Sequence, residues 1–449
     1  MKKILIANRG EIARRIIRTC ERLGIETVAI HSEADGDLPY VSEATQAVLI
    51  GPNPVVQSYL QIDKIIEEAK KHGVDAIHPG YGLLSENAGF ARRVAEAGMV
   101  FIGPSSDIIE KMGDKIESRR TMIKASVPVV PGTEEGVTTL EEALREAEAI
   151  GYPLMLKASA GGGGIGMVRC ESEQALTQQF VSVKNRAKAY FGDDVVYLEK
   201  FIADARHIEV QIFGDHHGNL VHLYERNCSV QRRNQKVIEE SPSPNLPPDV
   251  RERLCEAALQ AGKAVNYTNA GTVEFIVDPD NNFYFLEMNT RLQVEHPVTE
   301  EVTGLDLVEW QLNVADGGEL PSQDSIQTKG HAIEYRVYAE DPKTFFPSPG
   351  TLEKLQWGEG ARIETGYEEG NQVTPFYDPM ISKVIIRGTD RIDALSKSQT
   401  FFNRVTITGV KTNIPLFKEF IRSEEFVSGD YATAVLPQWM EKTKEEHTL

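Results

Sequence analysis

The segment 287–295, with the sequence EMNTRLQVE, brings two carboxylates, two side-chain amides and a guanidinium together within nine residues. Two runs rich in apolar residues precede it, at 272–277 and 283–286, and the polar residues 278–282 separate them. Such runs, joined by a short stretch of Asp, Asn and Pro, are typical of a β-hairpin. We therefore predict a hairpin whose second strand leads directly into the polar segment.

The two acids of this hairpin point to a metal site. If the hairpin is centred between Asp280 and Asn281, Glu274 lies opposite Glu287 and Asn289 follows on the same face. Opposed carboxylates repel each other unless they are solvated, share a proton or hold a cation, and oxygen ligands of this kind suit Mg²⁺. A solvent-exposed polar face is the alternative, but it is disfavoured by the apolar residues expected on that face: Ile276, Phe283 and Phe285.

The glycine-rich segment 159–167, SAGGGGIGM, is a second candidate site. Glycines leave backbone amides free to approach phosphates closely. Gly161, Gly163 and Gly166 fit the spacing of a dinucleotide fingerprint, but that loop must open a helix, and residues 167–170 read as a strand. We expect a hairpin whose tip covers a polyphosphate, with Lys157 near the same phosphates. A merely flexible surface loop is the alternative.

Other polar clusters favour simpler interpretations when they are taken alone. The strand 206–211 would place polar side chains on one solvated face: His207, Glu209 and Gln211. The segment 231–236 concentrates three cations in an otherwise acidic chain. Arg336 and Glu334 read as a surface pair, and Cys228 reads as a structural residue.

The order of the predicted elements indicates an α/β protein. Up to about residue 113, short apolar runs alternate with helical patterns, which predicts a parallel sheet with helical crossovers. The expected strands of this sheet are 4–7, 27–31, 47–50, 76–78 and 100–103. After about residue 316 the chain becomes strand-rich again and reads as a separate domain.

Composition and charge exclude several classes of protein. A chain of 449 residues is too long for a single core. The net charge of −19 disfavours nucleic acid as the main partner. No apolar run approaches the roughly 20 residues of a membrane span. The first strand begins too early for a signal peptide, and four scattered cysteines suggest no disulfide framework, so we expect a cytoplasmic protein.

Taken together, these features resemble the ATP-grasp superfamily and, within it, the biotin carboxylases. The resemblance covers essentially the whole chain. The motifs that carry it are ILIANRGEIA at 4–13, HPGYGLLSEN at 78–87, MGDK at 112–115, the glycine loop, QRRNQK at 231–236, the segment 287–300, and Arg336 with AEDP at 339–342.

The resemblance implies three parts and a set of site residues. An N-terminal parallel-sheet domain (1–113) would precede an ATP-grasp domain (114–316) with a mobile lid at about 131–203 and a strand-rich α+β C-terminal domain (317–449). The ATP contacts implied are Lys115, Lys157, Gly163, Gly164, Glu199, Lys200, Phe201, Ile202, His207, Asn234, Lys236, Glu274 and Glu287. Mg²⁺ or Mn²⁺ would be held by Glu274, Glu287 and Asn289. Bicarbonate would lie against Lys236, Arg291, Gln293 and Val294, with Glu295 as the base and Arg336 facing the biotin ureido oxygen.

The implied reaction is ATP-dependent carboxylation of biotin through carboxyphosphate. It would be the first half-reaction of an acyl-CoA carboxylase, acetyl-CoA being the expected substrate. No Met-Lys-Met pattern for biotin attachment occurs, so the expected partners are a separate biotin carrier protein and carboxyltransferase subunits. Members of the family usually form homodimers through the C-terminal domain and the first helix, which would place Arg15 at an interface. Another ATP-grasp ligase, or a non-catalytic nucleotide-binding subunit, is the alternative.

Two residues depart from the family pattern. Asn234 stands where the family usually has histidine, which we expect to alter nucleotide affinity without abolishing it. Ile165 replaces the usual arginine of the glycine loop and removes a positive charge near the closing lid.

We therefore predict that Ile165→Arg lowers the KM for ATP, because it returns a cation to the phosphate-covering loop. Steady-state kinetics with varied ATP would measure this, and an unchanged KM would contradict the interpretation of the loop.

Overall fold

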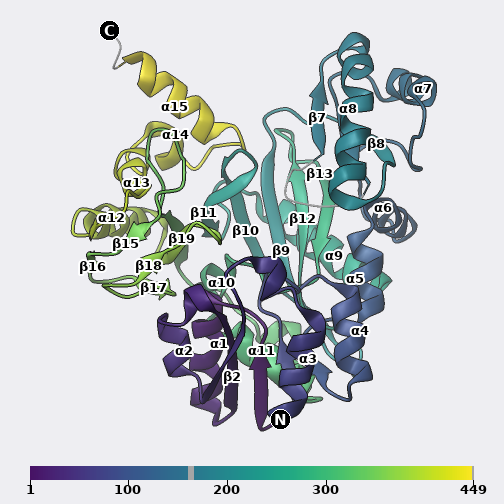
Figure 1. The fold of residues 1–449 in the computed structure, drawn as a ribbon. Coiled ribbons are helices and arrows are strands. Elements are labelled where there is room, and N and C mark those ends of the chain that lie inside the picture. Colours follow the sequence, from purple (N-terminus) through teal and green to yellow (C-terminus); the bar gives the residue numbers. More distant parts are fainter. Residues whose placement is uncertain (160–165, 447–449) are drawn as a thin grey trace.

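The structure is a computed structural model that describes residues 1–159 and 166–446 (Figure 1). The N-terminal part is a parallel five-stranded sheet in the order β3-β2-β1-β4-β5. Side chains of the central strand alternate between two cores, since Ile4 and Ile6 pack with helix α1 while Leu5 and Ala7 pack with α3 and α4. The predicted sheet with helical crossovers is confirmed. Its elements are β1 (Lys3–Ile6), α1 (Gly10–Leu23), β2 (Glu26–Ser32), α2 (Pro39–Glu43), β3 (Gln46–Gly51), α3 (Ile62–Lys71), β4 (Ala76–His78), α4 (Ala88–Glu96) and β5 (Val100–Phe101).

An eight-stranded antiparallel sheet forms the centre of the molecule. It crosses the predicted boundary between residues 316 and 317 without a break, because β11 pairs with β14. Its strands, in spatial order, are β13 (Phe283–Asn289), β12 (Asn269–Val277), β9 (Arg206–Gly214), β10 (Leu220–Arg232), β11 (Gln235–Ser241), β14 (His331–Tyr338), β19 (Met380–Gly388) and β17 (Arg362–Thr365).

A smaller unit stands apart at the upper right of Figure 1. It consists of a three-stranded sheet and two helices: β6 (Leu154–Ala158), β7 (Met167–Cys170), β8 (Val196–Lys200), α7 (Leu140–Ile150) and α8 (Glu173–Phe191). Strands β6 and β7 are antiparallel, with Lys157 opposite Met167. This pairing confirms the hairpin predicted around the glycine loop, whose residues 160–165 lie outside the described ones.

Helices pack against the central sheet at β9 and β10 and again, near the C-terminal end, at β14. Helix α9 packs against β9 and β10 through Val250, Leu254 and Ala258. At the C-terminal end, Phe402 and Phe417 pack edge-on around Tyr335 of β14. In the described ranges, no helix is long and apolar enough to cross a membrane. The remaining main helices are α5 (Ser106–Gly113), α6 (Lys115–Lys124), α9 (Pro248–Ala264), α10 (His296–Thr303), α11 (Leu307–Ala315), α12 (Arg391–Phe402), α13 (Ile414–Phe420), α14 (Glu424–Val427) and α15 (Val435–Glu446).

Short strands complete the C-terminal part as two separate pairs. They are β15 (Gly350–Thr351) with β18 (Gln372–Val373), and β16 (Lys354–Gln356) with β20 (Thr406–Thr408).

The β12–β13 hairpin has the predicted pair but not the predicted centre. Glu274 does lie opposite Glu287, yet Phe275 pairs with Phe285, so Leu286 is an extra residue in a β-bulge. On the turn side of the bulge the paired residues are therefore symmetric about Asp280, rather than about the point between Asp280 and Asn281. As a result Phe283 packs in the core with Phe275, and the prediction that Phe283 shares the acidic face is wrong. Phe285 contacts this core and also lines a cavity together with Glu287.

Arg15, expected at a dimer interface, makes its contacts within this chain. Its side chain is buried inside the molecule, where Nη2 donates to Glu300 at 2.6 Å and to Asp306 at 2.8 Å. Helix α1 begins close to the active-site strands, and these bonds tie it to the segment that follows β13.

A buried carboxylate joins β11 to the C-terminal helices. Glu240 accepts hydrogen bonds from Nε2 of His331 at 2.5 Å, from Nε of Arg391 at 2.8 Å, and from the hydroxyl of Tyr431. Burial alone would raise the pKa of Glu240, but these donors lower it to about 2. The ionised form is therefore the one that the fold stabilises.

We predict that Glu240→Gln lowers the free energy of unfolding by about 3 kcal/mol at pH 7, because it breaks a buried ion pair. A carboxyl whose pKa is depressed stabilises the fold above its unfolded pKa of 4.5, and this contribution is lost as the pH falls toward 2. Urea unfolding of variant and wild type at pH 7 and pH 3.5 would measure the difference, which should shrink at the lower pH. A difference that stays constant or grows on acidification would contradict the assignment.

Candidate active site

One cavity of about 1240 Å³ collects the residues predicted from the sequence. It is lined by loops and helix ends of the N-terminal part, by the small lid-like unit of β6–β8 and by the central sheet, β14 included. Gly163, Gly164 and Ile165 lie outside the described residues. All the other predicted site residues line the cavity: Lys115, Lys157, Glu199, Lys200, Phe201, Ile202, His207, Asn234, Lys236, Glu274, Glu287, Asn289, Arg291, Gln293, Val294, Glu295 and Arg336.

A row of charged side chains crosses four strands of the central sheet. Arg226 on β10 lies opposite Glu209 on β9, Glu209 lies opposite Glu274 on β12, and Glu274 lies opposite Glu287 on β13. Glu209 is fully buried, so the prediction of a solvated face on β9 is wrong. Three acids in register require cations nearby, because like charges on paired strands destabilise a sheet.

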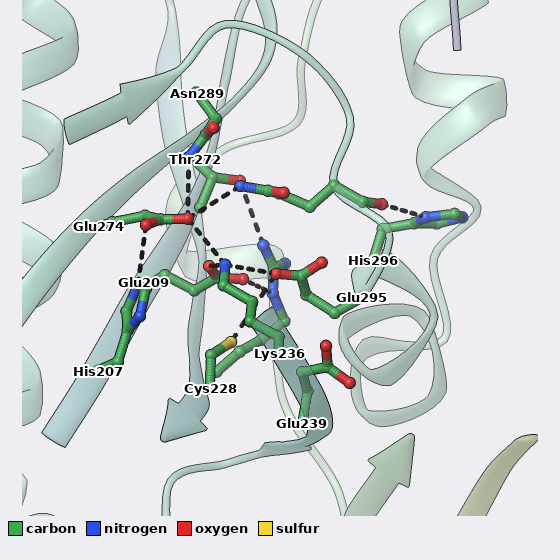
Figure 2. A network of polar contacts seen from close by, with 12 residues as sticks. His207, Glu209, Cys228, Lys236, Glu239, Thr272, Glu274, Asn289, Glu295 and His296 are labelled. Atoms are coloured by element: carbon green, nitrogen blue, oxygen red, sulfur yellow. Dashed lines mark hydrogen bonds and ion pairs between the residues drawn. The ribbon is translucent and has the colours of Figure 1, made fainter. Parts of the chain in front are cut away.

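Lys236 supplies the central cation of this site (Figure 2). Its Nζ donates to Glu209 at 2.6 Å, to Glu274 at 2.8 Å and to Glu295 at 2.7 Å. Burial alone would lower the pKa of Lys236, but the three carboxylates raise it well above its ordinary value. Arg226 adds a second cation, since its Nε donates to Glu209 at 2.5 Å.

His207 is fixed in one tautomer by its neighbours. The side-chain amide of Gln231 donates to Nδ1 at 2.8 Å and also to the carbonyl of Cys228, which sets the orientation of that amide. Nε2 of His207 therefore carries the hydrogen that bonds to Glu274 at 2.8 Å. Burial alone would raise the pKa of Glu274, but Lys236 and His207 lower it well below its ordinary value.

Glu295 is held as a carboxylate at the end of the polar segment. Lys236 and Arg336 outweigh the effect of burial and lower its pKa well below the ordinary value. The thiol of Cys228 donates to Oε1 of Glu295 at 3.9 Å. A carboxylate that is ionised at neutral pH and faces a cavity can accept a proton from a bound molecule.

Arg336 is largely buried, with 11% of its side chain exposed, and Glu334 is fully buried, so the surface pair expected from the sequence alone is wrong. Its Nη2 donates to Glu295 at 3.0 Å and lies 2.5 Å from Oε1 of Glu239. Nε of Arg336 is buried and has no hydrogen-bond partner among the described residues, while the residue as a whole lines the cavity. Burial raises the pKa of Glu239 to about 7, so this acid is partly protonated at neutral pH.

The three predicted metal ligands lie together on the cavity wall. Glu274 pairs with Glu287, and Nδ2 of Asn289 donates to Glu274 at 2.9 Å. The nearest cation to Glu287 is Lys115 at 3.4 Å, and part of the Glu287 side chain faces solvent. A set of hard oxygen donors with acidic charge fits Mg²⁺ or Mn²⁺.

A second group of possible ligands is already occupied by protein. Ligand atoms of His207, Glu209 and Glu274 lie within 4.8 Å of one another. Lys236 bonds to both of these carboxylates, so the protein itself supplies the cation there.

The side of the cavity next to the lid-like unit holds its own buried ion pairs. Nζ of Lys157 on β6 bonds to Glu199 on the neighbouring strand β8. Nη1 of Arg119 on α6 approaches the same carboxylate at 3.3 Å. The lid-like unit is thereby linked to the main body through residues that face the cavity.

Arg291 is oriented by residues on both sides of it. Its Nε donates to Glu86 at 2.8 Å, while its Nη atoms donate to Oε1 of Gln293 and Oδ1 of Asn289. This arrangement places one guanidinium between the predicted metal ligands and the residues 293–295.

The turn between β10 and β11 explains one departure from the family pattern. Arg233 and Asn234 both have positive φ, at 51° and 63°, as in the two-residue hairpin turns that asparagine favours. Of the three cations in the segment 231–236, only Lys236 lines the cavity. Arg232 instead bonds to Glu340 and lies over the ring of Phe345.

The sequence alone missed several residues that support the site. Glu209 had been placed on a solvated face, and no local pattern pairs Arg226, Arg119 or Glu239 with a partner. Glu86 lies in the motif at 78–87, but its bond to Arg291 spans 205 residues. Only strand register or comparison with known structures could have found these contacts.

Comparison with known proteins covers the whole chain. Three family models match: "Biotin carboxylase, N-terminal domain" at residues 1–109, "Carbamoyl-phosphate synthase L chain, ATP binding domain" at 114–323, and "Biotin carboxylase C-terminal domain" at 334–438. "Biotin carboxylase 2" of Bacillus subtilis is 58% identical over 439 residues, which are 97% of this chain and 99% of that protein.

Solved structures agree in fold. A biotin carboxylase from Campylobacter jejuni, described as a β-γ-ATP complex, has a TM-score of 0.96 at 44% identity, over 97% of this chain and 98% of that one. The biotin carboxylase domain dimer of 2-oxoglutarate carboxylase from Hydrogenobacter thermophilus, in complex with MgADP, ADP and bicarbonate, has a TM-score of 0.95 at 46% identity. There 97% of each chain is covered.

We predict that Glu239→Gln stabilises the protein at pH 8 by about 2 kcal/mol and is nearly neutral at pH 5. A carboxyl with a raised pKa stabilises the fold below its unfolded pKa of 4.5, and that contribution is lost as the pH rises through about 7. The neutral amide imitates the protonated acid and avoids this loss. Urea unfolding at both pH values would test it, with the adjacent Glu240→Gln as the control of opposite sign. A variant that is less stable than wild type at pH 8 would contradict the prediction.

Proposed function

Because the chain belongs to the biotin carboxylase family, we propose that it catalyses the first half-reaction of an acetyl-CoA carboxylase that serves fatty acid synthesis. The chain is an ATP-dependent ligase that carboxylates biotin. Other relatives are methylcrotonoyl-CoA, propionyl-CoA and pyruvate carboxylases, so the acyl acceptor is the specific part of the proposal. Two relatives at 58% and 56% identity are named biotin carboxylase and match over almost their full length, which favours a separate subunit.

One observation carries the assignment of roles. A single cavity holds the predicted nucleotide residues at one side and Lys236, Glu295 and Arg336 at the other. A phosphoryl group and its acceptor must meet in line, so both must be bound in one space. Glu287 lies in β13 and Arg291 follows two residues after that strand ends. This short separation supports the two binding regions being adjacent.

We assign nucleotide binding to residues from the lid, the hinge and the central sheet. Residues 199–202 would hold the base and sugar side, while Lys115 and Lys157 would bind phosphates. The backbone amides of Gly163 and Gly164 would cover those phosphates, and His207 and Asn234 would complete the site. Segment 131–203 would act as the lid, in an ATP-grasp domain spanning 114–316 between the parts 1–113 and 317–449.

Glu274, Glu287 and Asn289 would hold Mg²⁺ or Mn²⁺. A divalent ion bound there neutralises charge on the phosphate oxygens during transfer.

The chemistry of the acceptor side follows from the charges around Glu295. Bicarbonate would bind between Lys236 and Arg291, with Gln293 and Val294 completing its contacts. Glu295 is ionised and would accept the bicarbonate proton as an oxygen attacks the γ-phosphate, giving carboxyphosphate and ADP. Carboxyphosphate then separates into CO₂ and phosphate inside a closed site, where water cannot intercept it.

Arg336 would act on biotin rather than on bicarbonate. The residue lines the cavity, and its guanidinium would donate to the ureido oxygen, which stabilises the oxyanion that forms as the phosphate released from carboxyphosphate takes the proton of the biotin nitrogen. The nitrogen then attacks CO₂. Because Glu295 and Glu239 both contact Arg336, its position is set before biotin arrives.

The partners follow from the half-reaction. A separate biotin carrier protein would bring the ligand, and carboxyltransferase subunits would use the product. We also propose a homodimer, since the Hydrogenobacter relative is described as a dimer. All four cysteines are free thiols, which accords with a reducing cytoplasm.

The decisive experiment is bicarbonate-dependent ATP hydrolysis, measured with and without free biotin. Wild type should hydrolyse ATP with stimulation by biotin. Arg291→Ala and Glu295→Ala should each reduce that rate by roughly a hundredfold or more, because one loses the anion contact and the other the base. Arg92→Ala, which removes an exposed ion pair with Glu110, is the matched control and should retain the rate.

Other results would point elsewhere. Turnover that needs an acceptor other than biotin would identify a different ATP-grasp ligase. Nucleotide binding without turnover would identify a non-catalytic subunit. Full activity in Arg291→Ala and Glu295→Ala would refute the assigned roles.

A further inference from the structure

Residues 294 and 295 accept hydrogen bonds from side chains of two neighbouring strands of the central sheet, β14 and β19. Arg336 on β14 donates to the carboxylate of Glu295 at 3.0 Å. Lys383 on β19 donates from Nζ to the carbonyl oxygen of Val294 at 2.8 Å. Arg336 and Lys383 are directly paired in the sheet, so adjacent residues of the site are bound by adjacent cations.

Lys383 is an unusual residue in its burial. Its side chain is 0% exposed, and its Nζ lies 3.2 Å from Oε1 of Glu11, which is also buried. The ring of Tyr81 lies beneath it, 5.5 Å from the ammonium. A lysine is almost never fully buried unless it is paired, because desolvation of the ammonium is costly.

The contacts of Lys383 join three distant parts of the chain. Glu11 belongs to α1, Val294 follows β13, and Lys383 belongs to β19. Among the described residues, the shorter contact of Nζ is its hydrogen bond to the carbonyl of Val294 at 2.8 Å, and its ion pair with Glu11 is longer, at 3.2 Å. The backbone of the site is therefore the group toward which this donor is directed.

We propose that Lys383 is a positioning residue for the bicarbonate half of the reaction, an inference that rests on the function proposed above. The peptide between Val294 and Glu295 is planar, so a bond to its carbonyl fixes both flanking Cα atoms. Together with Arg336, Lys383 forms a two-point clamp on this dipeptide. The clamp sets where Val294 meets bicarbonate and where the Glu295 carboxylate points.

If Lys383 acts as this clamp, its loss should affect bicarbonate more than ATP, which would not follow if Lys383 only stabilised the fold. Misplacing the dipeptide affects the anion and its base, while Lys115, Lys157 and the hinge 199–202 are untouched. A purely structural lysine would instead weaken all substrates together or lower stability alone. The separation of the KM for bicarbonate from the KM for ATP is therefore the informative measurement.

The test compares three variants in bicarbonate-dependent ATP hydrolysis. Lys383→Met removes the ammonium and keeps an unbranched apolar chain. Lys383→Met combined with Glu11→Gln also removes the carboxylate that the first change leaves unpaired, so that folding is preserved. Lys397→Met is the matched control, because Lys397 likewise binds a carbonyl, that of Arg387 at 3.3 Å, and a carboxylate, that of Asp393 at 2.7 Å.

We expect both Lys383 variants to raise the KM for bicarbonate roughly tenfold or more, as a small misplacement of reacting groups does. Their KM for ATP should stay within about twofold of wild type, and Lys397→Met should match wild type in both constants. An unchanged KM for bicarbonate in a folded Lys383 variant would overturn the proposal. So would a parallel rise of both constants. Wild type that lacks bicarbonate-dependent hydrolysis would instead refute the proposed function itself, and the clamp with it.

Discussion

The structure depends on the need to bury three carboxylates around one ammonium. Glu209, Glu274 and Glu295 come from separate parts of the chain, and each bonds to Nζ of Lys236. Removing the cation would leave uncompensated charges in a buried site, which proteins do not tolerate. The strands that carry these groups are therefore held in a single register, and the cavity takes its shape from that register. The strand register that pairs these buried charges is thus the same register that forms the cavity.

Strand β11 connects this charged cluster to other parts of the molecule. Within five residues it carries Lys236 toward the reacting groups, Glu239 toward Arg336, and Glu240 toward the C-terminal helices. The pKa values of Glu239 and Glu240 are displaced in opposite directions. Burial outweighs the attraction of Arg336 and raises the pKa of Glu239, whereas His331 and Arg391 outweigh burial and lower the pKa of Glu240. Neighbouring identical residues thus have different ionisation for purely local reasons. Strand β11 therefore joins the site to the C-terminal part through strand pairing and ion pairs.

Much of this could be predicted from the sequence. Alternating runs identified the parallel sheet, the hairpin pattern brought Glu274 and Glu287 together, and the resemblance supplied the set of residues that line the cavity. The buried state of Glu209 and Arg336 could not be predicted, because burial on a strand depends on which strands pair beside it. The bulge at Leu286 was missed since a symmetric hairpin explains the same pair. Contacts such as Lys383 with Val294 join residues far apart and leave no local signal.

The bulge at Leu286 reverses, along β13, which face of the sheet the odd-numbered side chains point to. Near the turn, odd-numbered residues of both strands face the core, whereas beyond the bulge Glu287 and Asn289 face the cavity. The length of the turn and the composition of the reacting face can therefore vary independently during evolution. A designer who transplants this hairpin must keep the bulge, because a copy with the same residues that lacks it but keeps Phe275 paired with Phe285 would turn Glu287 and Asn289 toward the core.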